Sequence, residues 1–281
     1  MRKRWITSLL LCFLFVASLA QAHAVPIIGQ GRWDRDAIAY FARVQADGGV
    51  IISDVDVNNA IKHAKQYGYW SSVTFWTSAQ FGVKKDGSNA VSKLYCLKGN
   101  DAAQTTGSAQ PIWTANQHNG RAGVVFDGAS HYMTHAIDNS NAQYTAVAVA
   151  SRTGGLGYNT IFCAGNIIFL SRFATSENWG TYVTLSSSIS SSSILNVPTI
   201  MSVALRAADD FDLVTNGTVE TRNTGTFFYA ADRTRLGSSN STYPELHTGP
   251  IHEVVYMKNY VASATIRAAI ESFQNQKWTI Y

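Results

Sequence analysis

The chain has 281 residues, of which 14% are charged, 12% are aromatic and 46% are hydrophobic. Its formal net charge of +4 includes Arg2, Lys3 and Arg4, and without these three the balance is 19 basic against 18 acidic residues, or +1. A nearly neutral chain argues against nucleic acid or an anionic lipid surface as an electrostatically captured partner. The length is enough to bury a sizeable core in one domain, or in one domain with an appendage.

The N-terminus has the three-part plan of a secretory signal peptide. The basic residues precede an apolar stretch over residues 5–20, and two small-x-small sites follow, Ala20-Gln21-Ala22 and Ala22-His23-Ala24. The apolar stretch is shorter than the ~20 residues that a membrane span needs, so cleavage after Ala22 is favoured over an uncleaved anchor. We therefore predict a secreted, periplasmic or otherwise extracytoplasmic protein with no membrane span after cleavage.

Two amphipathic helices are predicted near the start of the mature chain. The first follows Asp34 and stops at Gly48-Gly49, with apolar residues at helical spacing: Ala37, Tyr40, Phe41 and Val44. The second follows Ser53, which begins a capping-box-like pattern, and ends near Gly68; its inward residues are Val57, Ala60, Ile61 and Ala64. Neither helix is large enough to form a core alone, so we expect both to pack on a β domain or on a partner.

Residues 69–81 are rich in aromatic side chains, which include Tyr69, Trp70, Phe75, Trp76 and Phe81. One interpretation is a platform on which sugar rings stack. The other is that these rings seat the two helices on the β domain, and this second interpretation is favoured.

From about residue 91 the chain reads as many short strands separated by Gly, Asn and Ser turns, which is typical of a sandwich or jelly roll. The predicted strands are Ser92–Leu97, Gly123–Phe126, Tyr132–Thr134, Tyr144–Arg152, Thr160–Ala164, Ile167–Phe173, Gly180–Leu185, Thr199–Ala207, Phe211–Thr215, Val219–Arg222, Thr234–Ser238 and Ile251–Met257. The serine run 186–193 is interpreted as a polar strand edge or a loop. Turn pairs include Asn216-Gly217.

Two further local patterns complete the predicted elements. Residues 120–132 place the turn pair Asp127-Gly128 between apolar runs and predict strand, tight turn, strand. Near the C-terminus, Ser263 can cap a helix that runs to about Trp278, with one apolar face made of Ile266, Ala269, Ile270 and Phe273.

Several motifs follow one another in a characteristic order: residues 93–102 (KLYCLKGNDA), 110–113 (QPIW), 125–128 (VFDG), 213–217 (LVTNG), 236–238 (LGS), 249–258 (GPIHEVVYMK) and the helix 264–278. Together they resemble LamG-like domains of the concanavalin A-like lectin/glucanase superfamily, over about residues 90–281. The resemblance implies a mainly β fold, an antiparallel two-sheet jelly roll. The expected organisation is a signal peptide (1–22), an extended lead and helical segment packed on the sandwich (23–88), and the jelly roll with its C-terminal helix (89–281).

The two cysteines of the mature chain, Cys96 and Cys163, are a candidate disulfide in an oxidising compartment, the alternative being two buried thiols. Where LamG-like domains often read Tyr-Asp-x-Ser-Gly-Asn, this chain has Cys in place of the Asp at position 96. The substitution favours the Cys96–Cys163 bridge and weakens a calcium site. Calcium held by loop carbonyls and Asp stays compatible with the superfamily, without assigned residues, and no other cofactor is expected.

Catalytic and metal-binding patterns are scarce. Retaining glycanases on this fold carry two carboxylates in a Glu-x-Asp-x-x-Glu strand, and this motif is absent from the sequence. Glu253, beside His252, is the one candidate acid or base, and a structural role for it is favoured. His131 and His135, with Asp127, could ligate a cation, but we favour ordinary surface or hydrogen-bonded histidines. Catalytic residues and metal ligands are therefore not assigned.

The best candidate ligand-binding residues are Tyr158 and Trp179, because both lie beside glycine and polar residues in predicted loops. The alternative is that both rings fold onto the rim of the sandwich. The leading hypothesis is a secreted, non-catalytic module that binds carbohydrate or a cell-surface glycan. A second is a structural or adhesion protein of an envelope or virion assembly that acts by protein contact, and a weaker third is a glycan-cleaving enzyme with a non-standard site.

Overall fold

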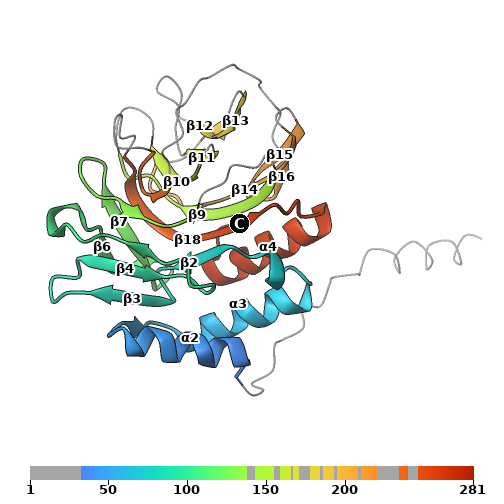
Figure 1. Ribbon diagram of the computed structural model, residues 1–281. Helices are drawn as coiled ribbons and strands as arrows, with labels where there is room; N and C mark the ends of the chain where they lie inside the picture. Colours follow the sequence, from blue (N-terminus) through green and yellow to red (C-terminus); the bar gives the residue numbers. More distant parts are fainter. Residues whose placement is uncertain are drawn as a thin grey trace, which may run out of the picture. The chain divides into compact units, whose positions relative to one another are not determined.

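A mainly β architecture, a sandwich of two antiparallel sheets, forms the part of the chain that the structure describes, and three α-helices accompany it (Figure 1). This computed structural model describes residues 33–137, 143–154, 159–165, 167–170, 178–183, 186–192, 195–207, 210–219, 234–239 and 246–281. The predicted signal peptide and most of the predicted extended lead lie outside these ranges. Among the described helices, none is long and apolar enough to cross a membrane.

The larger sheet, sheet A, has ten strands. Their order is β1 (Val50–Ile51), β3 (Gly82–Lys85), β4 (Val91–Tyr95), β5 (Ala102–Ala103), β8 (Met133–Thr134), β17 (Thr234–Leu236), β10 (Thr160–Ala164), β11 (Ile167–Leu170), β12 (Asn178–Val183) and β13 (Ser186–Ser192). The serine-rich β13 ends this order, in agreement with its interpretation as a polar edge strand.

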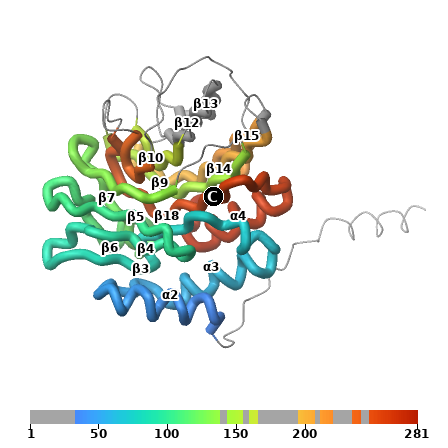
Figure 2. Tube along the Cα trace, viewed as in Figure 1, coloured from blue at the N-terminus to red at the C-terminus, as the bar shows by residue number. Residues whose placement is uncertain are grey.

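The second sheet, sheet B, has eight strands and contains the longest one. Its order is β16 (Thr218–Val219), β15 (Asp210–Thr215), β14 (Thr199–Ala207), β9 (Tyr144–Ala150), β18 (Thr248–Lys258), β7 (Arg121–Asp127) and β6 (Ile112–His118), and β2 (Phe75–Ser78) also pairs with β18. Figure 2 shows β9 and β18 running side by side through the centre of the molecule.

Alternation along the strands of sheet B creates two apolar layers. Ala146 and Ala148 of β9 face the core between the two sheets, whereas Val147 and Val149 face the helices. In β2, Phe75 belongs to the first core and its neighbour Trp76 to the second. The aromatic segment 69–81 therefore seats the helices on the sandwich, as favoured, because its rings are buried or half-buried: Tyr69, Trp70, Phe75, Trp76 and Phe81.

The helices begin where the caps predict. α2 (Arg35–Ala46) follows Asp34, whose carboxylate accepts a hydrogen bond from the Asp36 N–H. α3 (Asp54–Gln66) follows Ser53, and α4 (Ala264–Trp278) follows Ser263; each hydroxyl accepts a hydrogen bond from a backbone N–H of the first turn. Short 3₁₀ turns cover Trp70–Ser72 and Gly107–Ala109.

The predicted strands on either side of Asp127-Gly128 are present as β7 and β8, but the two strands do not pair with each other. β7 lies in sheet B and β8 in sheet A, so Asp127-Gly128 turns the chain from one sheet to the other and does not close a hairpin. The Asp127 carboxylate fixes this turn by accepting hydrogen bonds from the backbone N–H groups of residues 129–131 at 2.8–2.9 Å. The hairpin lies one strand earlier, where Asn119-Gly120, both with positive φ, join β6 to β7.

Candidate functional site

Helices cover the central strands of sheet B on its outer face. Val149 on β9, Ile200 on β14 and Val255 on β18 lie in one buried cluster with Ile270 and Trp278 of α4. A ligand therefore has no access to this central part of the sheet face. α2 in turn packs against one end of the outer face of sheet A, at β3 and β4.

Beyond β4, a row of side chains crosses the outer face of sheet A. The strand registers pair Lys93 with Ala103, Ala103 with Thr134 and Thr134 with Arg235. Their chain neighbours Leu94, Ala102, Met133 and Leu236 all belong to the core between the sheets, so this row points away from that core. Thr134 is exposed, and Lys93, Ala103 and Arg235 are half-buried.

Tyr132 projects from the same face, two residues before Thr134, and is half-buried. The Arg235 guanidinium lies 4.2 Å from the centre of the Tyr132 ring. The backbone of Tyr132 is fixed on both sides, since its N–H donates to the Ala109 carbonyl (3.2 Å) and its carbonyl accepts from the Gln104 side chain (3.0 Å). This surface, made of Lys93, Ala103, Tyr132, Thr134 and Arg235, is called the Tyr132–Arg235 face below.

The metal-site hypothesis at Asp127, His131 and His135 does not assemble. His131 lies 3.6 Å from Asp127, but His135 is buried against the rings of Phe75 and Phe162, at centroid distances of 5.2 and 5.0 Å. Partial burial raises the pKa of Asp127, but the backbone N–H groups of its turn and the Ser130 hydroxyl outweigh it and hold that pKa well below its usual value. No group of three or more His, Cys, Asp or Glu side chains suited to a metal ion occurs among the described residues.

Glu253, the one candidate acid or base, is only 1% exposed. Its carboxylate accepts hydrogen bonds from four side chains: Trp76 (2.6 Å), Gln274 (3.0 Å), Lys277 (2.7 Å) and Trp278 (3.0 Å). A carboxylate that is buried and surrounded by donors cannot reach a substrate. The favoured structural role agrees with this arrangement.

The predicted disulfide is not formed in the structure, because Cys96 and Cys163 are separate, buried free thiols. The Cys96 sulfur accepts hydrogen bonds from the N–H groups of Trp76 and Lys98, both at 3.3 Å. The Cys163 thiol donates to the carbonyl of Ser238 at 3.1 Å. Each thiol thus has its own polar partners, which is the alternative that the sequence left open.

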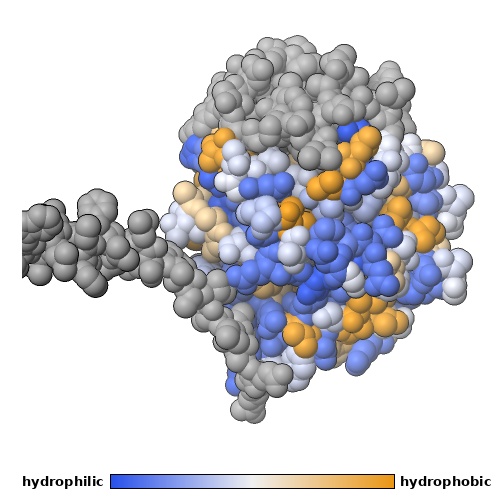
Figure 3. Space-filling model, turned by 180° about the vertical axis from the view of Figure 1, so that it is seen from behind, coloured by the Kyte–Doolittle hydropathy of each residue, from blue (hydrophilic) through white to orange (hydrophobic). Residues whose placement is uncertain are grey.

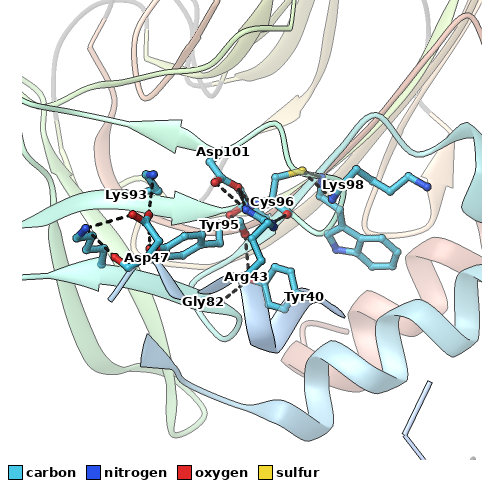
Figure 4. Close-up of polar contacts among 12 residues, drawn as sticks. Tyr40, Arg43, Asp47, Gly82, Lys93, Tyr95, Cys96, Lys98 and Asp101 are labelled. Atoms are coloured by element: carbon cyan, nitrogen blue, oxygen red, sulfur yellow. Dashed lines mark hydrogen bonds and ion pairs between the residues drawn. The ribbon is translucent and has the colours of Figure 1, made fainter. Parts of the chain in front are cut away.

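A polar cluster joins α2 to sheet A (Figure 4). Arg43 bonds both carboxylate oxygens of Asp101, at 2.8 and 2.9 Å, and Asp101 also accepts from the Cys96 N–H. At the end of the helix, Asp47 accepts hydrogen bonds from Lys93 and from the Tyr95 hydroxyl, both at 2.7 Å. These groups satisfy one another, so the cluster holds the helix in place.

The sequence-predicted ligand residues are only partly located. Tyr158 lies outside the described residues. Trp179 belongs to β12, next to the β13 edge of sheet A, and only its backbone is described. Sequence analysis did not select Tyr132 or Arg235. The available signal was that Tyr132 is the first residue and Arg235 the second residue of a predicted strand. The partners of these strands were unknown, and only the pairing of β8 with β17 brings the two residues together.

No protein-family model and no curated protein matches the sequence. Among solved structures, the chain is similar to Trypanosoma rangeli sialidase in complex with 2,3-difluoro-KDN, with 13% identity and a TM-score of 0.50 over 74% of this chain and 33% of the sialidase. It is also similar to the binding domain of botulinum neurotoxin serotype D, with 11% identity and a TM-score of 0.50 over 72% of this chain and 52% of that one.

A third similar structure is domain 4 of an extracellular arabinanase from Geobacillus stearothermophilus, in complex with arabinotriose, with 12% identity and a TM-score of 0.47 over 72% of this chain and 98% of that domain. The chain thus spans a third of the sialidase and about half of the neurotoxin domain. At such identities the likeness to the sialidase and to the neurotoxin domain shows a shared fold, and that fold is a β-sandwich consistent with a jelly roll.

Proposed function

We propose that this chain is an exported, non-catalytic carbohydrate-binding module with a LamG-like jelly roll. The observation that carries the proposal is Tyr132, held beside Arg235 on the part of sheet A that the helices leave uncovered. An aromatic ring packs against the C–H face of a sugar, and a neighbouring guanidinium and hydroxyl, here those of Arg235 and Thr134, bond its hydroxyls. Similarity to carbohydrate-related proteins such as the sialidase supports the proposal only through the fold.

Binding of purified residues 23–281 to a glycan array and to insoluble polysaccharides tests the proposal, with and without calcium. Tyr132→Ala is expected to weaken binding about tenfold, since aromatic contacts contribute ~1 kcal/mol beyond the area they bury. Trp70→Ala is the matched control, because Lys98 lies at the same 4.2 Å from its ring but on the helix side of the molecule. Equal losses in both variants, or none in Tyr132→Ala, would remove the site from the Tyr132–Arg235 face.

Tyr158 and Trp179 stay proposed ligand residues and belong in the same experiment. A Tyr158→Ala/Trp179→Ala double variant that loses binding would place ligand contacts beyond the Tyr132–Arg235 face. A calcium-dependent signal would support the calcium that the family resemblance allows. Release of reducing sugar from the same polysaccharides tests the hypothesis of a glycan-cleaving enzyme. If the Glu253→Gln variant releases as much sugar as the native chain, Glu253 is not the catalytic acid or base.

Export is part of the proposal, through the predicted cleavage after Ala22. Mass spectrometry of the protein recovered from its native compartment should find a mature chain that begins at His23. An intact Met1 would contradict the signal peptide and leave the glycan-binding hypothesis to be judged on binding alone.

The second candidate function is a structural or adhesion protein that acts by protein contact, as part of an envelope or virion assembly. The observation that favours it is exposed apolar surface on the helical segment, where Ile38 is 53% and Val55 is 55% exposed. This function would be favoured over the first if the folded protein binds no glycan and the Ile38→Glu variant no longer binds its assembly partner.

A further inference from the structure

Tyr132, on which the proposed carbohydrate site depends, lies just outside the strand ladder of sheet A. It follows the turn at Asp127-Gly128 and directly precedes β8, which has only two residues. Strand pairing therefore begins after Tyr132, at Met133 and Thr134. The direction in which the Tyr132 ring projects must be set by contacts other than the hydrogen bonds of the sheet.

These contacts come from one segment, residues 104–110, which is called the supporting loop below. The Tyr132 N–H donates a hydrogen bond to the Ala109 carbonyl at 3.2 Å. The Tyr132 carbonyl accepts a hydrogen bond from Nε2 of Gln104 at 3.0 Å. The supporting loop thus bonds both polar backbone groups of Tyr132, one from each of its ends.

Gln104 is the most strongly bonded residue of this loop and is only 5% exposed. Its side-chain amide uses both ends, because Nε2 donates to Tyr132 while Oε1 accepts from the Thr106 N–H at 3.0 Å. Its backbone is fixed as well: the N–H donates to the Ser92 carbonyl of β4, and the carbonyl accepts from the Gln110 side chain, both at 2.9 Å. The group that bonds Tyr132 is therefore itself held by sheet A and by the loop.

We propose that Gln104 is a positioning residue for Tyr132 in ligand binding, an inference that rests on the proposed carbohydrate-binding function. Gln104 is buried, so it acts through Tyr132 and not by touching the ligand. Its bond to the Tyr132 carbonyl fixes the backbone from which the ring projects beside Arg235. A ring that is held in place before the ligand arrives loses less conformational freedom on binding.

The mixed character of the protein surface makes such positioning important. In the view from behind, Figure 3 shows the described apolar residues in small groups that are separated by hydrophilic ones. A polar ligand on a surface of this kind is held by a few individual side chains, so the placement of each one affects the affinity. Loss of the hydrogen bond that places Tyr132 should weaken glycan binding about fivefold, the scale of one net hydrogen bond.

A double-mutant cycle, measured on a polysaccharide that the native chain binds, tests this role. Gln104→Met nearly keeps the side-chain volume but removes the donor and the acceptor. It should weaken binding about fivefold in the native chain and not at all in the Tyr132→Ala variant, where no ring remains to be positioned. Gln80→Met is the matched control and should leave binding unchanged. Gln80 is also buried, at 7% exposed, but its carbonyl accepts from the Ser53 N–H at the start of α3.

A second measurement needs no glycan. When the tyrosines are replaced by fluorotyrosine, the fluorine resonance of residue 132 is identified by its absence from the Tyr132→Phe variant. This resonance should move in Gln104→Met and stay in place in Gln80→Met. If Gln104→Met does not fold, Gln110→Ala takes its place in both measurements, because it removes only the bond to the Gln104 carbonyl.

The outcomes separate this role from the proposed function. An unmoved resonance overturns the positioning role, and so does a loss of affinity on Gln104→Met that is equal with and without the Tyr132 ring. In both cases glycan binding by the native chain stands. If the native chain binds no polysaccharide, the proposed function fails, and the fluorine resonance still decides whether Gln104 places Tyr132.

Discussion

The ammonium group of Lys277 lies 2.7 Å from the carboxylate of Glu253, in a place where the two side chains are 4% and 0% exposed. The pair joins the last turn of α4 to the middle of β18. The indole N–H groups of Trp76 and Trp278 and the Gln274 side-chain amide also donate to the carboxylate. A buried ion pair is stabilising only when such additional hydrogen bonds satisfy both partners. The C-terminal helix is thus attached to sheet B by a specific polar contact as well as by apolar packing.

Removal of Lys277 should destabilise the fold strongly. Lys277→Met leaves the Glu253 charge buried without its cation, and a broken buried pair costs about 3–5 kcal/mol. Urea unfolding followed by tryptophan fluorescence gives the change in the free energy of unfolding. Lys84→Met is the control. The Lys84 ammonium lies 3.4 Å from the Asp47 carboxylate and bonds the Asp47 carbonyl at 2.7 Å, but both side chains are about 40% exposed, a setting in which an ion pair is worth at most ~1 kcal/mol. If the free energy of unfolding falls by a similar amount in the two variants, the buried pair contributes no more to stability than an exposed one.

Gly82 is expected to control the position of α2. A Cβ added at Gly82 would lie 2.7 Å from the Tyr40 hydroxyl and 2.9 Å from Val44 (Figure 4 shows Tyr40 beside Gly82). Gly82→Ala should therefore push the helix outward and cost about 1–3 kcal/mol, the usual effect of overpacking. Gly87→Ala is the matched control, since nothing lies within 4 Å of its added Cβ. Differential scanning calorimetry that finds equal melting temperatures for Gly82→Ala and the native chain would contradict this packing.

Acid should destabilise the protein before Asp47, Asp127 and Asp212 titrate, because hydrogen bonds hold the pKa values of these carboxyls well below their usual range. Burial lowers the pKa of four histidines from about 6.5 to about 4: His63, His135, His247 and His252. The unfolded chain binds protons at these sites below pH 6.5 and the folded chain does not, so stability is complete above that pH and falls between about 6.5 and 4. Each histidine contributes about 3 kcal/mol to the fall.

The measurement is the free energy of unfolding in urea as a function of pH. His135→Phe, placed between Phe75 and Phe162, should flatten the slope in this window by about one proton, whatever its effect on stability at neutral pH. An unchanged slope would mean that His135 is not buried as a neutral ring.

The two cysteines should behave as protected free thiols. Burial raises the pKa of Cys96 despite backbone N–H groups that bond its sulfur, so the reactive thiolate is disfavoured. Residues 23–281, purified without reductant, should react with two equivalents of a thiol reagent in denaturant and with almost none when folded. If the thiols react in denaturant only after a reductant is added, the two cysteines form a disulfide and this prediction is wrong.

The sequence alone determined the helices and much of the β-rich body. The caps at Asp34, Ser53 and Ser263 and the apolar residues at i, i+3 and i+4 act within one or two turns, so a short window contains their whole cause. The strand Thr199–Ala207 was likewise predicted with the bounds that the structure has. The sequence left open whether Cys96 and Cys163 form a bridge or two buried thiols, because an even cysteine count carries no geometry.

Tertiary structure alone decided which strands meet and which surface stays open. β2 was not predicted, because its aromatic run pairs with β18 near the other end of the chain, and β7 and β8 separate into different sheets although one turn joins them. Tyr132 and Arg235 become neighbours only through the pairing of β8 with β17. Strand pairing depends on hydrogen bonds between segments that are distant in the sequence. These bonds leave no periodic pattern in either segment, so the candidate site can be recognised only in the assembled sheets.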